Sequence, residues 1–256
     1  MKTIEESVIN AMDGEDKNLY PYIPYILQDL CEFGASPEII INLIKKHKSD
    51  FEKLKILDLG SGKGAVSIKI AKEFKCHCSG IDAVKEFVDE SIIKAKEYNV
   101  EKYCEFEAGD IRTKIFNKTK YDIIILGAIG PVFGDYYSTI TRLKKCLLSD
   151  GLIIVDDSYL DENSNFSHSQ IEKKSNIINQ IANAEMRIID EAIISKEQIK
   201  ESNKNIFNKI RRRCEELIKK EPKNRLLFES YIKNQENENE VLEQKVICST
   251  MVIGKI

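Results

Sequence analysis

The chain has 256 residues, of which 42% are hydrophobic and 32% are charged, and its formal net charge is -3. This length and balance suit one α/β domain with insertions, or a domain with a small cap, and allow a full core. The slight acidic excess argues against a nucleic-acid binder held by bulk positive charge. The longest apolar stretch, 123–129, is too short to cross a bilayer, so no membrane partner is expected.

The first 50 residues are expected to be mainly helical. In "SPEIIINLIKKH", Ser36 fits an N-cap, Pro37 fits the first helical position and Glu38 falls in the first turn. The preceding "YPYIPYILQDL" contains two prolines, which predict an extended or turn entry into a helix near Ile26.

From residue 54 onward, short apolar runs alternate with segments of helical periodicity. Strands are expected at 54–60, 76–82, 103–110, 121–130 and 151–157. Helices are expected between them at 63–74, 84–98 and 136–148. The fourth run is almost entirely apolar, as in a strand buried on both faces. Strands alternating with helices imply a parallel sheet with right-handed crossovers.

The last hundred residues give a weaker pattern. A polar loop follows Asp157, and a helix near 169–183 leads to a sixth strand, "EMRIIDEAII". A long charged segment, about 195–240, is predicted to be helical, and "KVICSTMVIGKI" reads as a seventh strand.

The cysteine pattern points to a reducing compartment. The seven cysteines are odd in number and form no C-x-x-C pair, which argues against a disulfide framework. Cys76 and Cys78 flank His77 on one strand, but alternation turns His77 to the opposite face and no second ligand pair is evident. The N-terminal "MKTIEESVIN" lacks the apolar core of a signal peptide. We therefore expect no metal and a cytoplasmic location.

The most informative stretch is "ILDLGSGKGA". Gly60, Gly62 and Gly64 follow a buried strand and open a helix, where glycines permit positive φ and close ligand approach. The helix N-terminus adds free N–H groups. Asp82 ends the next strand, where a carboxylate can accept both hydroxyls of a ribose. Together these features predict a site for an adenosyl ligand.

Two classes of adenosyl ligand remain open at this point. Gly60, Gly62 and Ala65 also satisfy the dinucleotide fingerprint G-x-G-x-x-G/A. Asp58, directly under the loop, would repel a pyrophosphate but suits the ammonium of a methionine moiety. Asp110 closes the third strand and can accept from an adenine amino group, with Ile111 against the ring.

On these motifs, residues 54–156 and the final hairpin resemble the class I S-adenosylmethionine-dependent methyltransferases. The resemblance implies an α/β, Rossmann-like fold: a seven-stranded, mostly parallel sheet with an antiparallel last strand and helices on both faces. It implies S-adenosyl-L-methionine as cofactor and names its binding residues. Carried onto this sequence, they are Asp58, Gly60, Ser61, Gly62, Gly64, Asp82, Ala83, Asp110, Ile111, Gly127 and Ala128.

Two segments depart from the minimal family fold. We expect residues 1–50 to form a helical cap and residues 51–256 the methyltransferase domain, with a helical insertion at about 195–240. Cap and insertion would close the enzyme around a modest acceptor. Tyr20, Tyr22 and Tyr25 either line the acceptor site from the cap or only pack the cap against the sheet.

No single catalytic residue follows from the sequence. Methyl transfer from a sulfonium is an in-line displacement in which positioning supplies much of the rate, and a base helps only a protonated acceptor. The chain lacks an N-P-P-Y-type tetrapeptide and a Pro-Cys pair after the fourth strand. The remaining candidates near the carboxyl ends of strands are Asp135, Tyr136, Asp157 and Tyr159.

A small-molecule methyltransferase is the favoured function. An RNA or protein methyltransferase is the alternative, in which the cluster Arg211, Arg212 and Arg213 would contact the substrate instead of forming a solvated helical face. A NAD-binding oxidoreductase is disfavoured by Asp58. A non-catalytic sensor of the cofactor is the fourth possibility. His47 and His168 are lone histidines with no assigned role.

Overall fold

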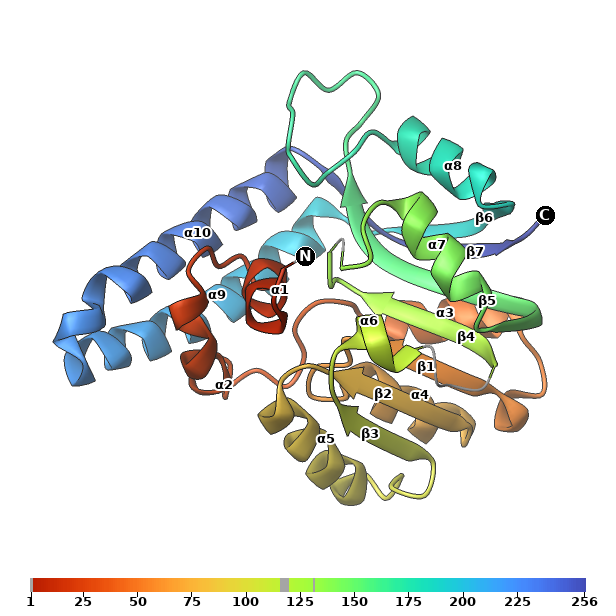
Figure 1. Cartoon of the computed structure of the whole chain (residues 1–256), viewed down its shortest axis with the longest axis horizontal. Helices are drawn as coiled ribbons and strands as arrows, with labels where there is room; N and C mark the ends of the chain where they lie inside the picture. The colour runs from red at the N-terminus through yellow and green to blue at the C-terminus, as the bar shows by residue number, and fades with distance from the viewer. Residues whose placement is uncertain (1, 116–119, 131) are drawn as a thin grey trace.

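The computed structural model describes residues 2–115, 120–130 and 132–256. Its centre is a seven-stranded sheet in the order β3-β2-β1-β4-β5-β7-β6 (Figure 1). The strands are β1 Lys55–Leu59, β2 His77–Asp82, β3 Cys104–Ala108, β4 Tyr121–Gly127, β5 Leu147–Tyr159, β6 Met186–Ile193 and β7 Ile247–Lys255. β7 runs antiparallel to both β5 and β6, while the other pairs are parallel. This confirms the predicted fold class.

Helices cover both faces of the sheet and extend beyond it. The α-helices are α1 Ile4–Ala11, α2 Ile23–Ile26, α3 Pro37–His47, α4 Ala65–Phe74, α5 Lys85–Glu97, α6 Ile111–Lys114, α7 Tyr136–Lys144, α8 Lys174–Asn183, α9 Lys196–Lys220 and α10 Arg225–Gln244. The 3-10 helices are η1 Lys17–Tyr22, η2 Phe51–Lys53 and η4 Pro222–Asn224. As predicted, Ser36 caps α3, with its side chain accepting from the amide of Ile39, and Pro37 begins the helix.

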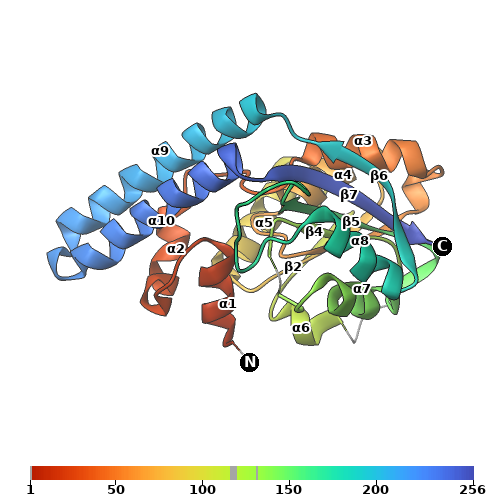
Figure 2. The ribbon, with the colours of Figure 1, turned by 90° about the horizontal axis from the view of Figure 1, so that it is seen from above.

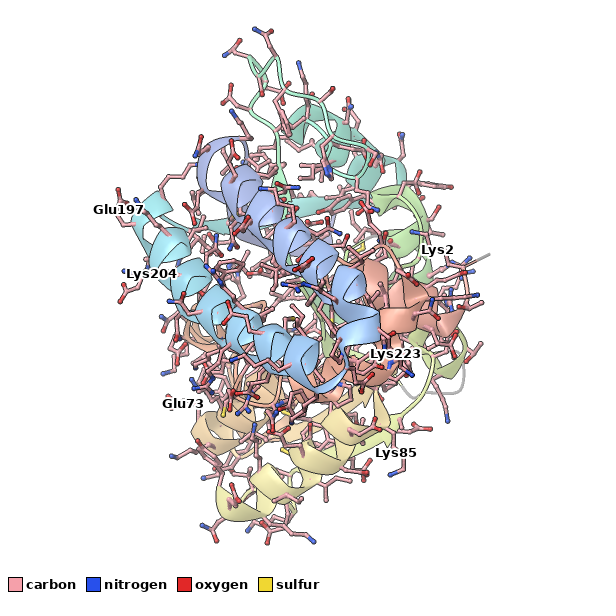
Figure 3. All side chains as sticks on the ribbon, turned by 90° about the vertical axis from the view of Figure 1, so that its left-hand side faces the viewer. Lys2, Glu73, Lys85, Glu197, Lys204 and Lys223 are labelled. Carbon is pink, nitrogen blue, oxygen red and sulfur yellow. The ribbon has the colours of Figure 1, made fainter. Side chains whose placement is uncertain are left out.

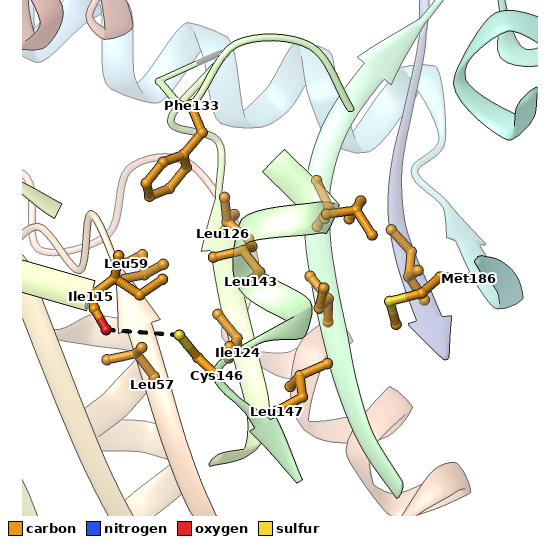
Figure 4. Close-up of a cluster of buried hydrophobic side chains, with 14 of the residues drawn as sticks. Leu57, Leu59, Ile115, Ile124, Leu126, Phe133, Leu143, Cys146, Leu147 and Met186 are labelled. Atoms are coloured by element: carbon orange, nitrogen blue, oxygen red, sulfur yellow. Dashed lines mark hydrogen bonds between the residues drawn. The ribbon is translucent and has the colours of Figure 1, made fainter. Parts of the chain in front are cut away.

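The sheet is sandwiched between two apolar layers. On one face, side chains of α6, α7 and α8 pack against alternate residues of the strands, including Leu57, Ile124 and Ile153. Figure 4 shows this layer, in which the thiol of Cys146 lies 3.7 Å from the carbonyl oxygen of Ile115. On the other face, α3 and α4 pack against the opposite set of strand residues. Because successive side chains of a strand point to opposite faces, each strand contributes residues to both apolar layers.

A third apolar cluster lies outside the sheet. It joins α1, η1 and α2 to the long hairpin of α9 and α10, and includes Ile9, Leu19, Ile26, Cys214 and Phe228. Figure 2 shows the hairpin projecting from the sheet with α1 and α2 beside it. The late insertion is thus helical, as predicted, and its two helices span 196–220 and 225–244.

The segment predicted as a cap, 1–50, divides into two parts by its packing. Residues from α1 to α2 pack on the hairpin. In α3, Ile40, Leu43 and Ile44 instead pack with the sheet and α4. α3 therefore packs with the sheet, and its first turns also line the cavity described below.

Candidate active site

A cavity of about 1040 Å³ lies at the carboxyl ends of the parallel strands. One end of it, called the loop end here, is lined by the loops after β1, β2, β3 and β4, including Asp58, Gly60, Asp82 and Asp110. The other, called the far end, is lined by residues including Asp13, Tyr136, Asp157, Ile206, Glu238 and Cys248. The cavity sits where the strand order reverses, between β1 and β4, which is where open α/β sheets bind ligands.

The glycines after β1 fit a loop that must lie close to its neighbours. Gly60, Gly62 and Gly64 have φ values of +71°, +52° and +76°. A Cβ atom on Gly60 would stand 2.3 Å from Cγ2 of Ile129, and one on Gly64 would stand 2.9 Å from the ring of Phe106. Gly60 and Gly62 line the cavity, whereas Gly64 lies behind it and serves the packing of the loop.

Asp82 holds this loop in place. The amides of Gly62 and Val84 each donate to one of its carboxylate oxygens, at 2.8 Å. The side chain is buried, and this burial raises the pKa of the carboxyl above its usual value. A buried carboxylate with remaining lone pairs is suited to accept from ligand hydroxyls.

Asp58 lies beneath the same loop and is 3% exposed. Its Oδ2 accepts from the hydroxyl of Ser67, at 2.7 Å. Burial raises its pKa to about 6, the Ser67 hydrogen bond opposes that rise, and the charge of Asp82 adds to it. A cationic ligand group beside Asp58 would favour its charged form.

Asp110 connects the loop end to the N-terminal helix. Its carboxylate caps α6 by accepting from the amide of Arg112, and the guanidinium of Arg112 binds the same carboxylate at 2.8 to 3.0 Å. Arg112 also donates to the carbonyl of Lys2 and the hydroxyl of Ser7. These bonds to Arg112 lower the pKa of Asp110. The arginine thus links α1 to the predicted adenine end.

The loop after β4 completes the loop end. Gly127 and Ala128 line the cavity, and Ala128 has φ of +55°. The amide of Ala128 donates to the carbonyl of Asp156 on β5. Of the predicted cofactor residues, the cavity is lined by Asp58, Gly60, Ser61, Gly62, Asp82, Ala83, Asp110, Ile111, Gly127 and Ala128.

Three of the four catalytic candidates line the cavity. Tyr136 donates its hydroxyl to Asp157, at 2.8 Å, and burial raises the pKa values of both side chains. Asp135 caps α7, accepting from the amide of Ser138. Tyr159 lies outside the described lining, where its hydroxyl accepts from Lys174.

The three tyrosines of the cap do not line the cavity in the part of the chain that the structure describes. Tyr22 donates to Glu221 and Tyr25 donates to Glu216, both at 2.6 Å. Tyr20 packs in the third apolar cluster. Of the two alternatives, the structure places them as packing residues, and they pack the cap against the hairpin instead of the sheet.

The three consecutive arginines are also engaged within the chain. Arg212 and Arg213 bind the carboxylate of Asp29 on the cap, at 2.5 to 2.7 Å, and Arg211 binds Glu215. On the outer side of α9 lie other charged residues, among them the labelled Glu197 and Lys204 (Figure 3). The arginines therefore tie the hairpin to the cap.

Several lining residues of the far end were missed by sequence reasoning. Asp13, Gln235 and Glu238 line the cavity, as does His168, to which no role was assigned. The amide of Gln235 donates to Asp13 at 3.0 Å, across 222 residues of sequence. Such pairs carry no local pattern. The sole hint was the "DG" at Asp13, a turn signal.

Within residues 2–115, 120–130 and 132–256, no group of three or more histidine, cysteine or acidic side chains is placed to hold a metal ion. No helix in those ranges is both long and apolar enough to span a membrane.

The sheet order, its antiparallel β7, the glycine loop after β1 and the acids after β1, β2 and β3 together define a class I methyltransferase fold. A sequence model of this family, the methyltransferase domain, matches residues 50–241. The chain belongs to this family, the class I methyltransferases whose methyl donor is S-adenosylmethionine.

Similar proteins agree with this assignment. Over 112 residues the chain is 30% identical to a ribosomal protein L11 methyltransferase of Dictyoglomus thermophilum, a match that covers 44% of this chain and 36% of that protein. The chain thus spans about a third of this relative's length. A methyltransferase of Geobacter sulfurreducens, solved with S-adenosyl-L-homocysteine, superimposes with a TM-score of 0.76 at 13% identity, covering 92% and 98% of the two chains. One of Thiobacillus denitrificans, solved with the same ligand, gives 0.76 at 15% identity, covering 91% and 98%.

Proposed function

We propose that this enzyme transfers a methyl group from S-adenosylmethionine to a small-molecule acceptor bound at the far end of the cavity. The observation that carries the proposal is the continuity of the cavity. It begins at the glycine loop and extends beneath α1, α9 and α10, which cover the space above the sheet. A cavity covered in this way suits a compact acceptor better than a polymer.

The loop end fits S-adenosylmethionine on three features of this chain. Gly60 lines the cavity with φ of +71°, so its backbone can lie against a ligand where a side chain would be strained. The hydroxyl oxygen of Ser61 is buried and has no hydrogen-bond partner among the described residues. Asp82 offers carboxylate oxygens beside the loop. We propose Asp82 for the ribose, Asp58 for the ammonium of the methionine moiety, and Asp110 with Ile111 for the adenine.

The chain's own contribution to the reaction is positioning and proton transfer. When bound, S-adenosylmethionine supplies an activated methyl group for in-line displacement. The loop end would fix the direction of that methyl group, and α1, α9 and α10, which cover the cavity, would exclude water. Asp157, held by Tyr136, could accept a proton from the acceptor, because its raised pKa makes the carboxylate a stronger base than an exposed one.

The pairing of the arginine cluster disfavours RNA or protein as substrate. Arg211, Arg212 and Arg213 each already bind a carboxylate of this chain, so they offer less charge to a polyanion. We also propose a cytoplasmic location, supported by seven cysteines that are all free thiols.

Methyl-labelled S-adenosylmethionine tests the proposal. The purified chain is incubated with the low-mass, RNA and protein fractions of a cell extract, and label is counted in each. We expect label in the low-mass fraction. Label confined to RNA or protein would overturn the small-molecule acceptor.

A further inference from the structure

The far end of the cavity carries carboxylates on separate walls. Asp156 and Asp157 lie on β5, Asp13 follows α1, and Glu238 lies on α10. Asp156 is paired in the sheet with Gly127, and its carbonyl binds Ala128, so the β5 pair adjoins the loop end. The far end therefore begins where the methyl donor's site stops.

These carboxylates face a shared space. Cys248, on β7, lines the cavity. Burial and the charges of Asp156, Asp157 and Glu238 raise the pKa of its thiol to about 11, and Lys196 opposes that rise. Glu238 also lies close enough to Asp13 to act on it: burial first and Glu238 second raise the pKa of Asp13 to about 7. Acids from β5 and from α10 thus lie around Cys248.

Lysine and arginine side chains of the described lining are already committed, and His168, whose charge opposes the rise in the pKa of Glu238, is the other basic residue of this lining. Lys63 binds Glu90 at 2.8 Å and the carbonyl of Leu27 at 2.9 Å, and it is 2% exposed. Arg112 binds Asp110 and the carbonyl of Lys2.

Three of the acids at the far end already accept hydrogen bonds. Asp156 accepts from Thr250, Asp157 from Tyr136 and the amide of Ser158, and Asp13 from the side-chain amide of Gln235. All of these donors are neutral, so they leave the negative charge in place. Glu238 has no hydrogen bond or ion pair with the described residues. An anionic acceptor would meet repulsion in this space, and a cationic one attraction.

The remaining wall of the far end is mixed. α9 and α10 line the cavity with the apolar residues Ile199, Ile206, Ile210 and Leu242, and with polar residues that include Ser202, Asn203 and Asn239. A ligand with a hydrocarbon body and a polar head would satisfy both parts of the lining.

We infer that the methyl acceptor is an amine: a primary or secondary ammonium group among the carboxylates of Asp156, Asp157, Asp13 and Glu238, attached to an apolar body against α9. This inference rests on the proposed function. The ammonium passes one proton to Asp157. The nitrogen lone pair then forms the N–C bond as the C–S bond breaks, and the electron pair of that bond stays on sulfur. The product is the N-methylated ammonium.

Matched probes test the charge preference. The full chain, saturated with S-adenosylhomocysteine, is titrated in a calorimeter with 2-phenylethylamine, 2-phenylethanol and 3-phenylpropionate, and with a panel of alkylamines of increasing length. We expect an amine to bind at least about tenfold more tightly than its carboxylate counterpart, the effect of charged hydrogen bonds. Equal or tighter binding of the carboxylate, or no binding by any amine of the panel, would overturn the inference.

Isosteric variants locate the effect. Asp157→Asn and Glu238→Gln should each reduce amine affinity by about tenfold while leaving the binding of the neutral alcohol unchanged. Glu240→Gln is the matched control, since Glu240 is exposed on the same helix and outside the described lining. Binding of S-adenosylhomocysteine, measured first in every variant, shows that the chain is folded. Failure of the unaltered chain to bind S-adenosylhomocysteine would contradict the proposed function, whereas amine affinity that is unchanged in both folded variants would contradict only the acceptor class.

Discussion

The two ends of the cavity are built in different ways. The loop end comes from the turns that follow β1, β2, β3 and β4, whose positions are set by the sheet. The far end comes from the N-terminal segment, the end of β5 and the α9–α10 hairpin, which meet outside the sheet. The proposed donor site is therefore formed by loops whose places the sheet sets, and the proposed acceptor site by segments that pack on one another outside the sheet.

The largest effect is expected at Gly60. In Gly60→Ala the new Cβ would stand 2.3 Å from Ile129, so the loop must shift. We expect calorimetry to show that S-adenosylhomocysteine binds about 100-fold more weakly or not at all, because the shifted loop would lose its hydrogen bonds to the ligand. Gly130→Ala is the control, because Gly130 also has positive φ, +64°, but nothing lies within 4 Å of its Cβ position. An equal loss in both variants would mean that backbone strain, not close approach, matters.

A smaller effect is expected at Asp82. Asp82→Ala removes the acceptor of the Gly62 and Val84 amides as well as the proposed ribose contact. Binding of S-adenosylhomocysteine should weaken by about 10- to 100-fold. Asp122 lies near the start of β4 and accepts a hydrogen bond from the amide of Lys55. Asp122→Ala loses that bond and should bind S-adenosylhomocysteine as the unaltered chain does. Unchanged affinity in Asp82→Ala would show that the ribose lies elsewhere.

Cofactor affinity should depend on pH through Asp58. Its pKa of about 6 belongs to the buried side chain beside Ser67 and Asp82. Below this pKa the carboxyl is neutral and must lose a proton to bind an ammonium. Affinity should therefore fall as pH drops from 7 to 5, by at most about tenfold per pH unit. Titrations across this range test it, and Asp58→Asn should flatten the profile. A profile that stays equally steep in the variant would assign the titration to another group.

The smallest effect concerns the contact between cap and hairpin. Asp29→Asn weakens the bonds to Arg212 and Arg213, which lower the pKa of Asp29 in the folded chain. We expect the melting temperature to fall by a few degrees. Glu215→Gln, which affects one exposed pair within α9, should change it less. If the two variants have the same melting temperature, the contact of Asp29 with Arg212 and Arg213 contributes little to the packing of the cap on the hairpin.

The sequence predicts the loop end well because its residues are contiguous or end successive strands. "ILDLGSGKGA" places Asp58 and the glycines on one turn, and Asp82 and Asp110 close the next two strands. Helix caps such as Ser36 are equally local. The length of β5 was not predicted. It begins at Leu147, which pairs with Tyr121, and a register shift separates this pair from that of Ile123 with Leu152.

The far end is harder to predict because its contacts join distant segments. Asp13 meets Gln235 across 222 residues, and Asp29 meets Arg213 across 184. Tyr22 and Tyr25 are of a residue type that often lines binding sites, but their hydroxyls donate to Glu221 and Glu216 of the hairpin. Which side of the cap lines the cavity depends on how the cap packs against the hairpin. No local periodicity encodes that packing.

Binding of S-adenosylmethionine at the loop end underlies every role proposed for this enzyme. Calorimetric titration of the purified chain with S-adenosylmethionine, S-adenosylhomocysteine and NAD, side by side, measures it. We expect the two adenosyl-sulfur compounds to bind with one site per chain and NAD not to bind. Binding of NAD without binding of S-adenosylhomocysteine would contradict it, and would make Gly60, Gly62 and Ala65 a pyrophosphate loop.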